Sequence, residues 1–165
     1  EEVERNYLEI NSIQDLIEVA KPVDDYSLNL LVPNNFQLNK FFYKEIGKNH
    51  KWIDRLSWSE EKWINYVSSE NVQTYVFKFK DDLVGFFELI FHLEKNETEI
   101  AYFGILEEYQ NKKLGSYLLS EAIKKSFKKD VGRVWVHTCS LDHKNALNNY
   151  ISRGMKVYKT EILKI

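Results

Sequence analysis

The sequence predicts an α/β fold of the α+β type, in which helices pack on a mixed β-sheet. From residue 71 onward the apolar pattern reads β-β-β-α-β-α-β, so three strands in a hairpin series lead into βαβ units. The chain has 165 residues, of which 44% are hydrophobic and 29% charged, as is ordinary for one soluble domain with a sizeable core. We therefore expect a single domain over residues 1–165.

In the front half, caps and glycines set the expected element boundaries. Asn34 and Asn35 are typical helix N-caps, and Gly47 closes the helical pattern that follows them. Ser57 stands three residues before Glu60, as in a capping box that opens a further helix. The expected elements are strands over 3–10 and 26–32, helices over 12–20 and 36–47, and a helix within 52–69.

The back half contains most of the expected sheet. Residues 83–93 are apolar at nearly every position, as in a strand covered on both faces. Leucines recur at helical spacing from Leu114, and glycines at 132 and 154 are expected to end the two helices. The expected elements are strands over 72–80, 83–93, 97–106, 133–140 and 155–163, a helix from about 114 to before 132, and a helix over 142–154.

Composition excludes several classes of function. A net charge of −2 does not favour nucleic acid or an anionic membrane as partner, and no apolar run approaches the ~20 residues of a membrane span. The acidic N-terminal segment lacks an apolar signal region, and the single cysteine, Cys139, excludes an internal disulfide framework. The histidines show no metal-ligand spacing, so we expect no metal. A reducing cytoplasm is the expected location.

The stretch EEYQNKKLGSYLL, residues 107–119, has the properties of an anion site. It lies between an expected strand and an expected helix, and the free N–H groups of a helix start attract phosphate oxygens. Lys112 and Lys113 add positive charge, and Gly115 has no Cβ to obstruct a close approach. A solvated, lysine-rich helix start is the alternative interpretation of this turn taken alone.

Two separated motifs resemble those of the GNAT superfamily of acyl-CoA-dependent N-acyltransferases. Gln110, Lys113 and Gly115 stand at the fixed positions of its pyrophosphate-binding motif, with Lys113 in place of the usual glycine. Ala146 and Tyr150, followed by Gly154 and Met155, resemble its later motif. The resemblance implies a mixed, mostly antiparallel central sheet of six to seven strands flanked by about four helices. Residues 1–70 would form the acceptor side, and residues 71–165 the cofactor-binding core.

The resemblance implies acetyl-CoA (CoA) as cofactor. Alternation predicts one shared face for Glu99, Ala101, Phe103 and Ile105, and in relatives this strand binds the pantetheine arm and polarises the thioester carbonyl near the position of Ile105. His143 occupies the place where the family often has Asn, and Asn145 lies nearby. The implied cofactor-binding residues are Phe103, Gly104, Ile105, Gln110, Asn111, Lys112, Lys113, Leu114, Gly115, Ser116, His143, Asn145 and Tyr150.

Three residues are candidates for catalysis. Some family members use a glutamate at the position of Glu99 as general base, because an ammonium acceptor must lose a proton before it attacks. Glu88, inside an apolar strand, is the rival base, or a buried carboxylate paired with an Arg or Lys. The phenol of Tyr150 would protonate the departing thiolate, or would simply pack with a satisfied hydroxyl.

The aromatic front half is the expected acceptor site. Arg55 is a candidate for binding an acceptor carboxylate, and a helix-packing seam is the alternative interpretation of the same residues. The candidate substrate-binding residues are Tyr43, Trp52, Arg55 and Trp58.

These residues together predict an N-acetyltransferase that moves an acetyl group from acetyl-CoA to a primary amine by direct attack in a ternary complex. The acceptor is a small molecule or a peptide amine, and a homodimer is compatible with the sequence. The alternative function is a non-catalytic acyl-CoA-binding or protein-interaction module on the same fold. A nucleotide-binding domain is a weaker alternative, because the turn at 107–119 lacks a P-loop pattern.

Overall fold

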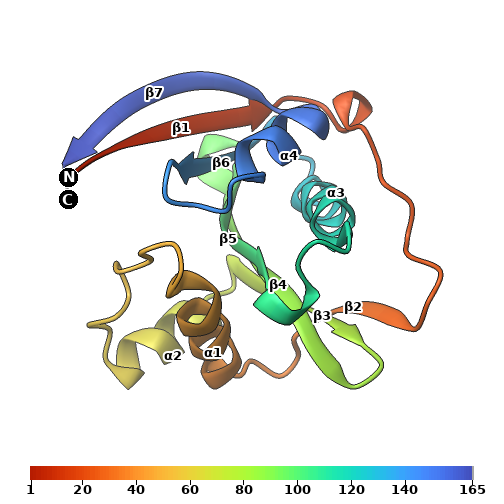
Figure 1. Ribbon diagram of the computed structural model, residues 1–165, viewed down its shortest axis with the longest axis vertical. Helices are drawn as coiled ribbons and strands as arrows, with labels where there is room; N and C mark the ends of the chain where they lie inside the picture. Colours follow the sequence, from red (N-terminus) through yellow and green to blue (C-terminus); the bar gives the residue numbers. More distant parts are fainter. Residues whose placement is uncertain (165) are drawn as a thin grey trace.

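The computed structural model describes residues 1–164, in which a seven-stranded sheet of order β2-β3-β4-β5-β6-β1-β7 carries four α-helices (Figure 1). Every neighbouring pair of strands is antiparallel except β5 and β6, which are parallel. This confirms the predicted fold class. The strands are β1 Glu2–Ile10, β2 Tyr26–Leu30, β3 Val72–Phe79, β4 Asp82–His92, β5 Glu97–Ile105, β6 Arg133–Cys139 and β7 Lys156–Lys164. The α-helices are α1 Phe36–Gly47, α2 Glu60–Ser68, α3 Leu114–Ser126 and α4 Ala146–Ser152.

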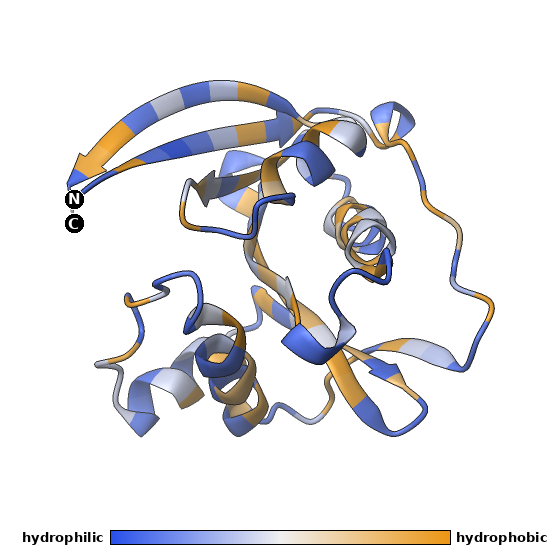
Figure 2. Cartoon of the chain, viewed as in Figure 1, coloured by the Kyte–Doolittle hydropathy of each residue, from blue (hydrophilic) through white to orange (hydrophobic). Residues whose placement is uncertain are grey.

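The helices cover both faces of the sheet, α1 and α2 on one and α3 and α4 on the other (Figure 1). Under α1, Phe42 stacks on Phe86 with ring centroids 4.8 Å apart. Under α3, Leu118 and Leu119 are fully buried against the opposite face of β4. The middle strands are accordingly the most hydrophobic part of the sheet (Figure 2), as residues 83–93 predicted.

The front-half helices differ from the sequence prediction in two places. Asn35 caps α1 as expected, but Ser59 rather than Ser57 caps α2, by accepting a hydrogen bond from the Lys62 N–H at 3.1 Å. The predicted helix over 12–20 is wrong, because only a 3₁₀ turn at Ile13–Asp15 forms there.

Tertiary hydrogen bonds explain why residues 16–20 are not helical. The Ile17 N–H donates to the Arg153 carbonyl at 3.0 Å, and the Val19 N–H donates to Ser120 Oγ at 3.2 Å. The segment therefore exchanges its helical hydrogen bonds for bonds to α3 and to the end of α4. The helices of the back half are also shorter than expected, since α3 ends at Ser126 well before Gly132 and α4 begins only at Ala146.

A β-bulge in β5 changes which side chains share a face. Glu99 pairs with Ile90, whereas Tyr102 pairs with Glu88, so Ala101 is an extra residue without a partner in β4. The alternation reverses at this point. The expectation of one common face for Glu99, Ala101, Phe103 and Ile105 is therefore wrong.

The two faces separated by the bulge have different surroundings. Glu99 lies on the α1 face together with Tyr102 and Gly104, whereas Phe103 and Ile105 pack toward α3. The bulge thereby places Glu99 on the same face as Glu88. A one-residue insertion of this kind leaves no clear trace in an alternating pattern.

Gly154 provides a test of the turn that joins α4 to β7. Its φ is +107°, and a Cβ at this position would lie 2.3 Å from the Asp15 carbonyl oxygen. We expect Gly154→Ala to lower the free energy of unfolding, measured by urea denaturation, by about 1–3 kcal/mol from backbone strain alone. Gly115→Ala is the control, because the nearest atom to its added Cβ, Asn149 Nδ2, is 3.8 Å away. Equal stability of the two variants would contradict the interpretation that the positive φ of Gly154 excludes a side chain from this turn.

Candidate active site

The site begins where two parallel strands separate. β5 and β6 pair only at Glu97–Arg133, Thr98–Val134 and Glu99–Trp135, although both strands continue beyond these pairs. A cleft of about 690 Å³ opens at this point, lined by residues 100–105 of one strand and by Val136, His137 and Cys139 of the other. The edge of β5 that faces β6 therefore presents backbone groups without a strand partner to the cleft. The sequence itself contains no signal for this separation.

The start of α3 borders the cleft and has no side-chain cap. Lys113, the N-cap residue, has φ +62°, and its side chain makes no capping hydrogen bond. The first N–H groups of a helix have no partner within the helix, so those of α3 are available to an anion. Gln110 joins this turn to the end of β5, because its Nε2 donates to the Ile105 carbonyl at 3.2 Å.

The backbone at residue 113 explains the pattern of the turn. A positive φ suits glycine, the residue usual at this position of the motif, and costs a residue with a Cβ about 1–2 kcal/mol. Asn111 also has a positive φ, of 64°. At Gly115, the second residue of the helix, an added Cβ would have one atom within 4 Å, Asn149 Nδ2 at 3.8 Å. Gln110, Asn111, Lys113, Leu114, Gly115 and Ser116 all line the cleft, whereas Lys112 does not.

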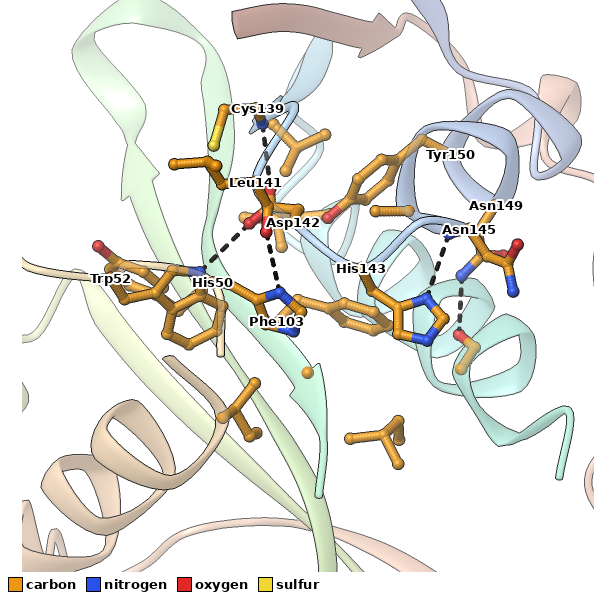
Figure 3. A pocket seen from close by; sticks show the side chains of 18 of the residues that line it. His50, Trp52, Phe103, Cys139, Leu141, Asp142, His143, Asn145, Asn149 and Tyr150 are labelled. Atoms are coloured by element: carbon orange, nitrogen blue, oxygen red, sulfur yellow. Dashed lines mark hydrogen bonds between the residues drawn. The ribbon is translucent and has the colours of Figure 1, made fainter. Parts of the chain in front are cut away.

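Tyr150 forms part of the opposite wall. Its ring extends from α4 toward Asp142 (Figure 3), and the centroids of the Tyr150 and Phe103 rings are 6.4 Å apart. Tyr150 is only 7% exposed. Burial, with a smaller contribution from the charge of Asp142, raises the pKa of Tyr150, so its phenol keeps its proton at neutral pH. The neighbouring Asn149 fixes α4 against α3, because its Nδ2 donates to the Gly115 carbonyl at 3.2 Å.

Asp142 connects the front and back halves across the cleft (Figure 3). One carboxylate oxygen accepts from Trp52 Nε1 at 3.3 Å. The other accepts from the Thr138 hydroxyl and from the Cys139 N–H, the latter at 3.1 Å. Beside it, His50 Nδ1 donates to the Leu141 carbonyl at 3.0 Å. Trp52 therefore lines the cleft as a candidate substrate-binding residue, while Asp142 and His50 were not identified from the sequence.

His143 and Asn145 also line the cleft, in the loop before α4. The Asn145 N–H donates to His143 Nδ1 at 3.2 Å, which fixes one ring nitrogen as an acceptor. Burial lowers the pKa of His143, and the neighbouring His50 and Lys144 lower it further. Both residues therefore present neutral polar groups to the cleft at neutral pH.

Four other candidate residues, Tyr43, Arg55, Trp58 and Glu88, do not line the cleft and form a cluster behind Tyr102, which does. Glu88 is fully buried and accepts hydrogen bonds from Arg55 at 2.9 Å, from the Tyr66 hydroxyl at 2.7 Å and from Asn39 at 2.8 Å. The Arg55 guanidinium is 6% exposed, and its Cζ lies between 4.4 and 5.8 Å from five aromatic rings. Those rings belong to Tyr43, Trp58, Trp63, Tyr66 and Tyr102.

These contacts are internal packing contacts that join the α1–α2 loop to α2, β4 and β5. Arg55 forms its ion pair with Glu88 inside the protein. Its backbone N–H donates to the Tyr43 hydroxyl at 2.9 Å. Glu99 is in a different position. It occupies the last pair before β5 and β6 separate, is 19% exposed, and accepts from His92 Nε2 at 3.0 Å.

The structure gives two further facts about ligands and surroundings. Within residues 1–164, no group of three or more His, Cys, Asp and Glu side chains is arranged to hold a metal ion. In the same part of the chain, every helix is too short or too polar to cross a membrane.

A mostly antiparallel sheet that opens between its two parallel strands, beside an uncapped helix start, defines the class of GNAT-like acetyltransferase folds. The Acetyltransferase (GNAT) family model matches residues 16–155, and the chain belongs to this family. The chain is thus a member of an acyltransferase family, as its motifs predicted.

Solved structures agree with this fold. A GCN5-related N-acetyltransferase from Sphaerobacter thermophilus is 16% identical with a TM-score of 0.70, over 96% of this chain and 49% of that one. One from Kribbella flavida is 14% identical with a TM-score of 0.67, over 95% and 55%. The PaiA N-acetyltransferase from Thermoplasma acidophilum, in complex with coenzyme A, is 23% identical with a TM-score of 0.51, over 64% and 74%. This chain spans about half the length of the first two. No curated protein matches it significantly in sequence.

The Arg55–Glu88 pair generates a prediction about stability. We expect Glu88→Gln to lower the free energy of unfolding by about 3–5 kcal/mol, because it leaves the buried guanidinium without its counter-charge. Urea denaturation measures this change. Lys48→Gln is the control, since it removes one partner of the exposed Lys48–Glu45 pair and should cost less than about 1 kcal/mol. Similar losses in both variants would show that the buried pair contributes no more than a surface pair.

Proposed function

We propose that the protein is an N-acetyltransferase that moves an acetyl group from acetyl-CoA to a primary amine, with both substrates bound at once. The observation that carries the proposal is the cleft, which runs from the uncapped start of α3, along the separated strands β5 and β6, to Tyr150. Its volume of about 690 Å³ is within the range of small-molecule sites. Membership of the family supports the reaction class.

The residues of the cleft fit CoA. The helix start at Leu114 offers N–H groups, Gly115 leaves room for a close approach, and Lys113 supplies positive charge for a diphosphate, with Lys112 adjacent to it in sequence. The unpaired edge of β5 offers backbone donors and acceptors of the kind that match the amides of a pantetheine arm. His143, Asn145 and Tyr150 would complete the far wall.

Acetyl-CoA supplies a thioester, whose carbonyl carbon bonds to the amine nitrogen while its bond to sulfur breaks. In this proposal the backbone N–H near Ile105 polarises the carbonyl oxygen. Glu99 accepts the proton of the acceptor ammonium through water, the Tyr150 phenol gives its proton to the departing thiolate, and the second proton that the nitrogen loses restores the phenol. The phenol holds its proton at neutral pH, so the proton is available when the thiolate forms.

The surroundings of the two carboxylates favour Glu99 over Glu88 as the proton acceptor. Glu88 is fully buried, and its two oxygens already accept three hydrogen bonds, one of them from a guanidinium. Glu99 is partly exposed, and the only hydrogen bond recorded for its side chain within residues 1–164 comes from His92. A carboxylate that exchanges protons with an acceptor must be reachable by water, which Glu99 is and Glu88 is not.

One observation favours the alternative function, a non-catalytic acyl-CoA-binding module. Glu99 lies one position before the residues that line the cleft, so its carboxylate reaches the acceptor only through water. A module of this kind would retain the uncapped helix start and the open edge of β5. It would not depend on a proton donor at Tyr150.

A Tyr150→Phe variant separates the two functions. For an enzyme that uses this phenol, the rate of CoA release in the presence of an accepted amine should fall by about 10²–10⁴-fold, with little change in the affinity for CoA. Tyr158→Phe, a half-exposed tyrosine on β7 outside the cleft, is the matched control. Tight CoA binding with no turnover on any amine would favour the module instead.

Gly115→Ala tests the diphosphate site. We expect the affinity for CoA, measured by calorimetry, to fall by about tenfold to hundredfold, because the added Cβ occupies the space that a phosphate would enter. The thermal midpoint of the free protein should not fall, since alanine favours a helix more than glycine does. Gln37→Ala, at the corresponding second position of α1, is the control. Unchanged affinity in the Gly115 variant would place the phosphates elsewhere.

A further inference from the structure

Arg5 presents an unpaired cation to the cleft. It lies on β1 opposite Cys139 of β6 and lines the cleft. Its Nε is buried, and within residues 1–164 this nitrogen has no hydrogen-bond partner. In the same range the guanidinium has no carboxylate within 4 Å, and its one hydrogen bond is a long one, 3.5 Å from Nη1 to the Tyr7 hydroxyl. A fork of donors with so few partners is suited to a planar anion.

The carboxylate opposite Arg5 on β7 does not pair with it. Glu161 is the register partner of Arg5, but it accepts its hydrogen bond from the Tyr7 hydroxyl at 2.5 Å and lies 3.7 Å from Lys159. Burial lowers the pKa of Arg5, while Tyr7, Glu161 and Asp54 together raise it above its ordinary value. Arg5 is therefore fully charged and close to carboxylates, but without a partner in contact.

Asp54 presents an unpaired anion to the same cleft. It lies in the loop between α1 and α2 and lines the cleft. Its carboxylate accepts only a long hydrogen bond, 3.4 Å, from the Tyr102 hydroxyl, and the part of the chain that the structure describes places no cation within 4 Å of it. Arg5 and Asp54 are thus not paired with each other, and the other charged residues that line the cleft are Lys51, Lys113, Arg153 and Asp142.

Several side chains near these two charges are uncharged. His137, from β6, lines the cleft near Arg5, and burial, with help from the Arg5 charge, lowers its pKa. Val3 and Leu163 add apolar surface beside Arg5. A guest with separated positive and negative groups matches this surface, whereas a polycation would meet the repulsion of Arg5.

We propose that the acceptor is an amine that also carries a carboxylate, of the amino-acid class, whose carboxylate is bound by Arg5 and whose ammonium approaches Asp54. The proposal rests on the N-acetyltransferase function proposed above and names its second substrate. Arg55, the guanidinium that the sequence suggested for this purpose, already holds Glu88. Arg5 is left with the donors that a carboxylate needs.

The test uses acceptor pairs in which one member carries a carboxylate and the other does not, compared at equal concentrations of the free amine. Glycine is compared with glycinamide, leucine with leucinamide, and 4-aminobutyrate with butylamine, by the kcat/KM of CoA release from acetyl-CoA. We expect at least one acid to exceed its uncharged partner by about tenfold to hundredfold. Arg5→Gln should abolish this preference by slowing the reaction of the acid while leaving the amide unchanged. Lys159→Gln removes a cation on β7, the strand that pairs with β1, outside the cleft. This variant should keep the preference for the acid.

The outcomes separate this proposal from the one on which it rests. Acetylation of amides and simple amines as fast as of acids, or an equal loss for both in Arg5→Gln, overturns the acceptor class and leaves the acetyltransferase standing. If no amine is acetylated, the proposed function fails, and calorimetry of the same pairs on the CoA-loaded protein decides the role of Arg5. Binding of an acid that is lost in Arg5→Gln supports the carboxylate site, and binding that is absent or indifferent to Arg5 overturns it.

Discussion

The parting of β5 from β6 after Glu99 is the constraint on which the rest of the structure depends. In a closed sheet the backbone groups on both edges would be paired, and no ligand would reach them. Here β6 keeps its antiparallel partner β1, and β5 keeps β4, so the sheet continues on either side of the opening. Unpaired backbone groups at the edge of an apolar cleft are unfavourable unless water or a ligand satisfies them. The separation therefore leaves hydrogen-bonding groups at the edge of β5 without a strand partner.

Two sets of contacts hold the opening at its width. On the side of the front half, the Arg55–Glu88 pair anchors the α1–α2 loop to β4 inside an aromatic cluster. On the other side, Asp142 joins the end of β6 to Trp52 of that same loop. The loop thus reaches the cleft from a rigid base, and Trp52 and Asp54 are held at its mouth. A buried ion pair is weak evidence of stability in itself, but it fixes geometry well, because either partner alone would be costly.

Features that depend on residues close together in the sequence could be predicted from the sequence. The helix at 36–47, its Asn35 cap and a helix that starts at Leu114 follow from residues a few positions apart, and the structure has all three. Contacts across the fold could not be predicted in this way. Trp52 and Asp142 are 90 residues apart, the bulge at Ala101 depends on pairing with β4, and Arg5 matters only because β1 lies beside β6. The helical pattern at 12–20 failed for the same reason, since Ser120 and Arg153 take its N–H groups.

The charges of the cleft are ordered along its length, and this order bears on the chemistry proposed for it. Lys112 and Lys113 lie at the start of α3, whereas Arg5 enters the cleft from β1 and Asp54 from the α1–α2 loop. Between them burial keeps Tyr150 protonated and His137 neutral. Asp142 is the carboxylate beside Tyr150, and hydrogen bonds from Trp52, the Thr138 hydroxyl and the Cys139 N–H engage both of its oxygens. A phosphate end and a zwitterion-binding end of the cleft would orient donor and acceptor toward each other before any covalent step.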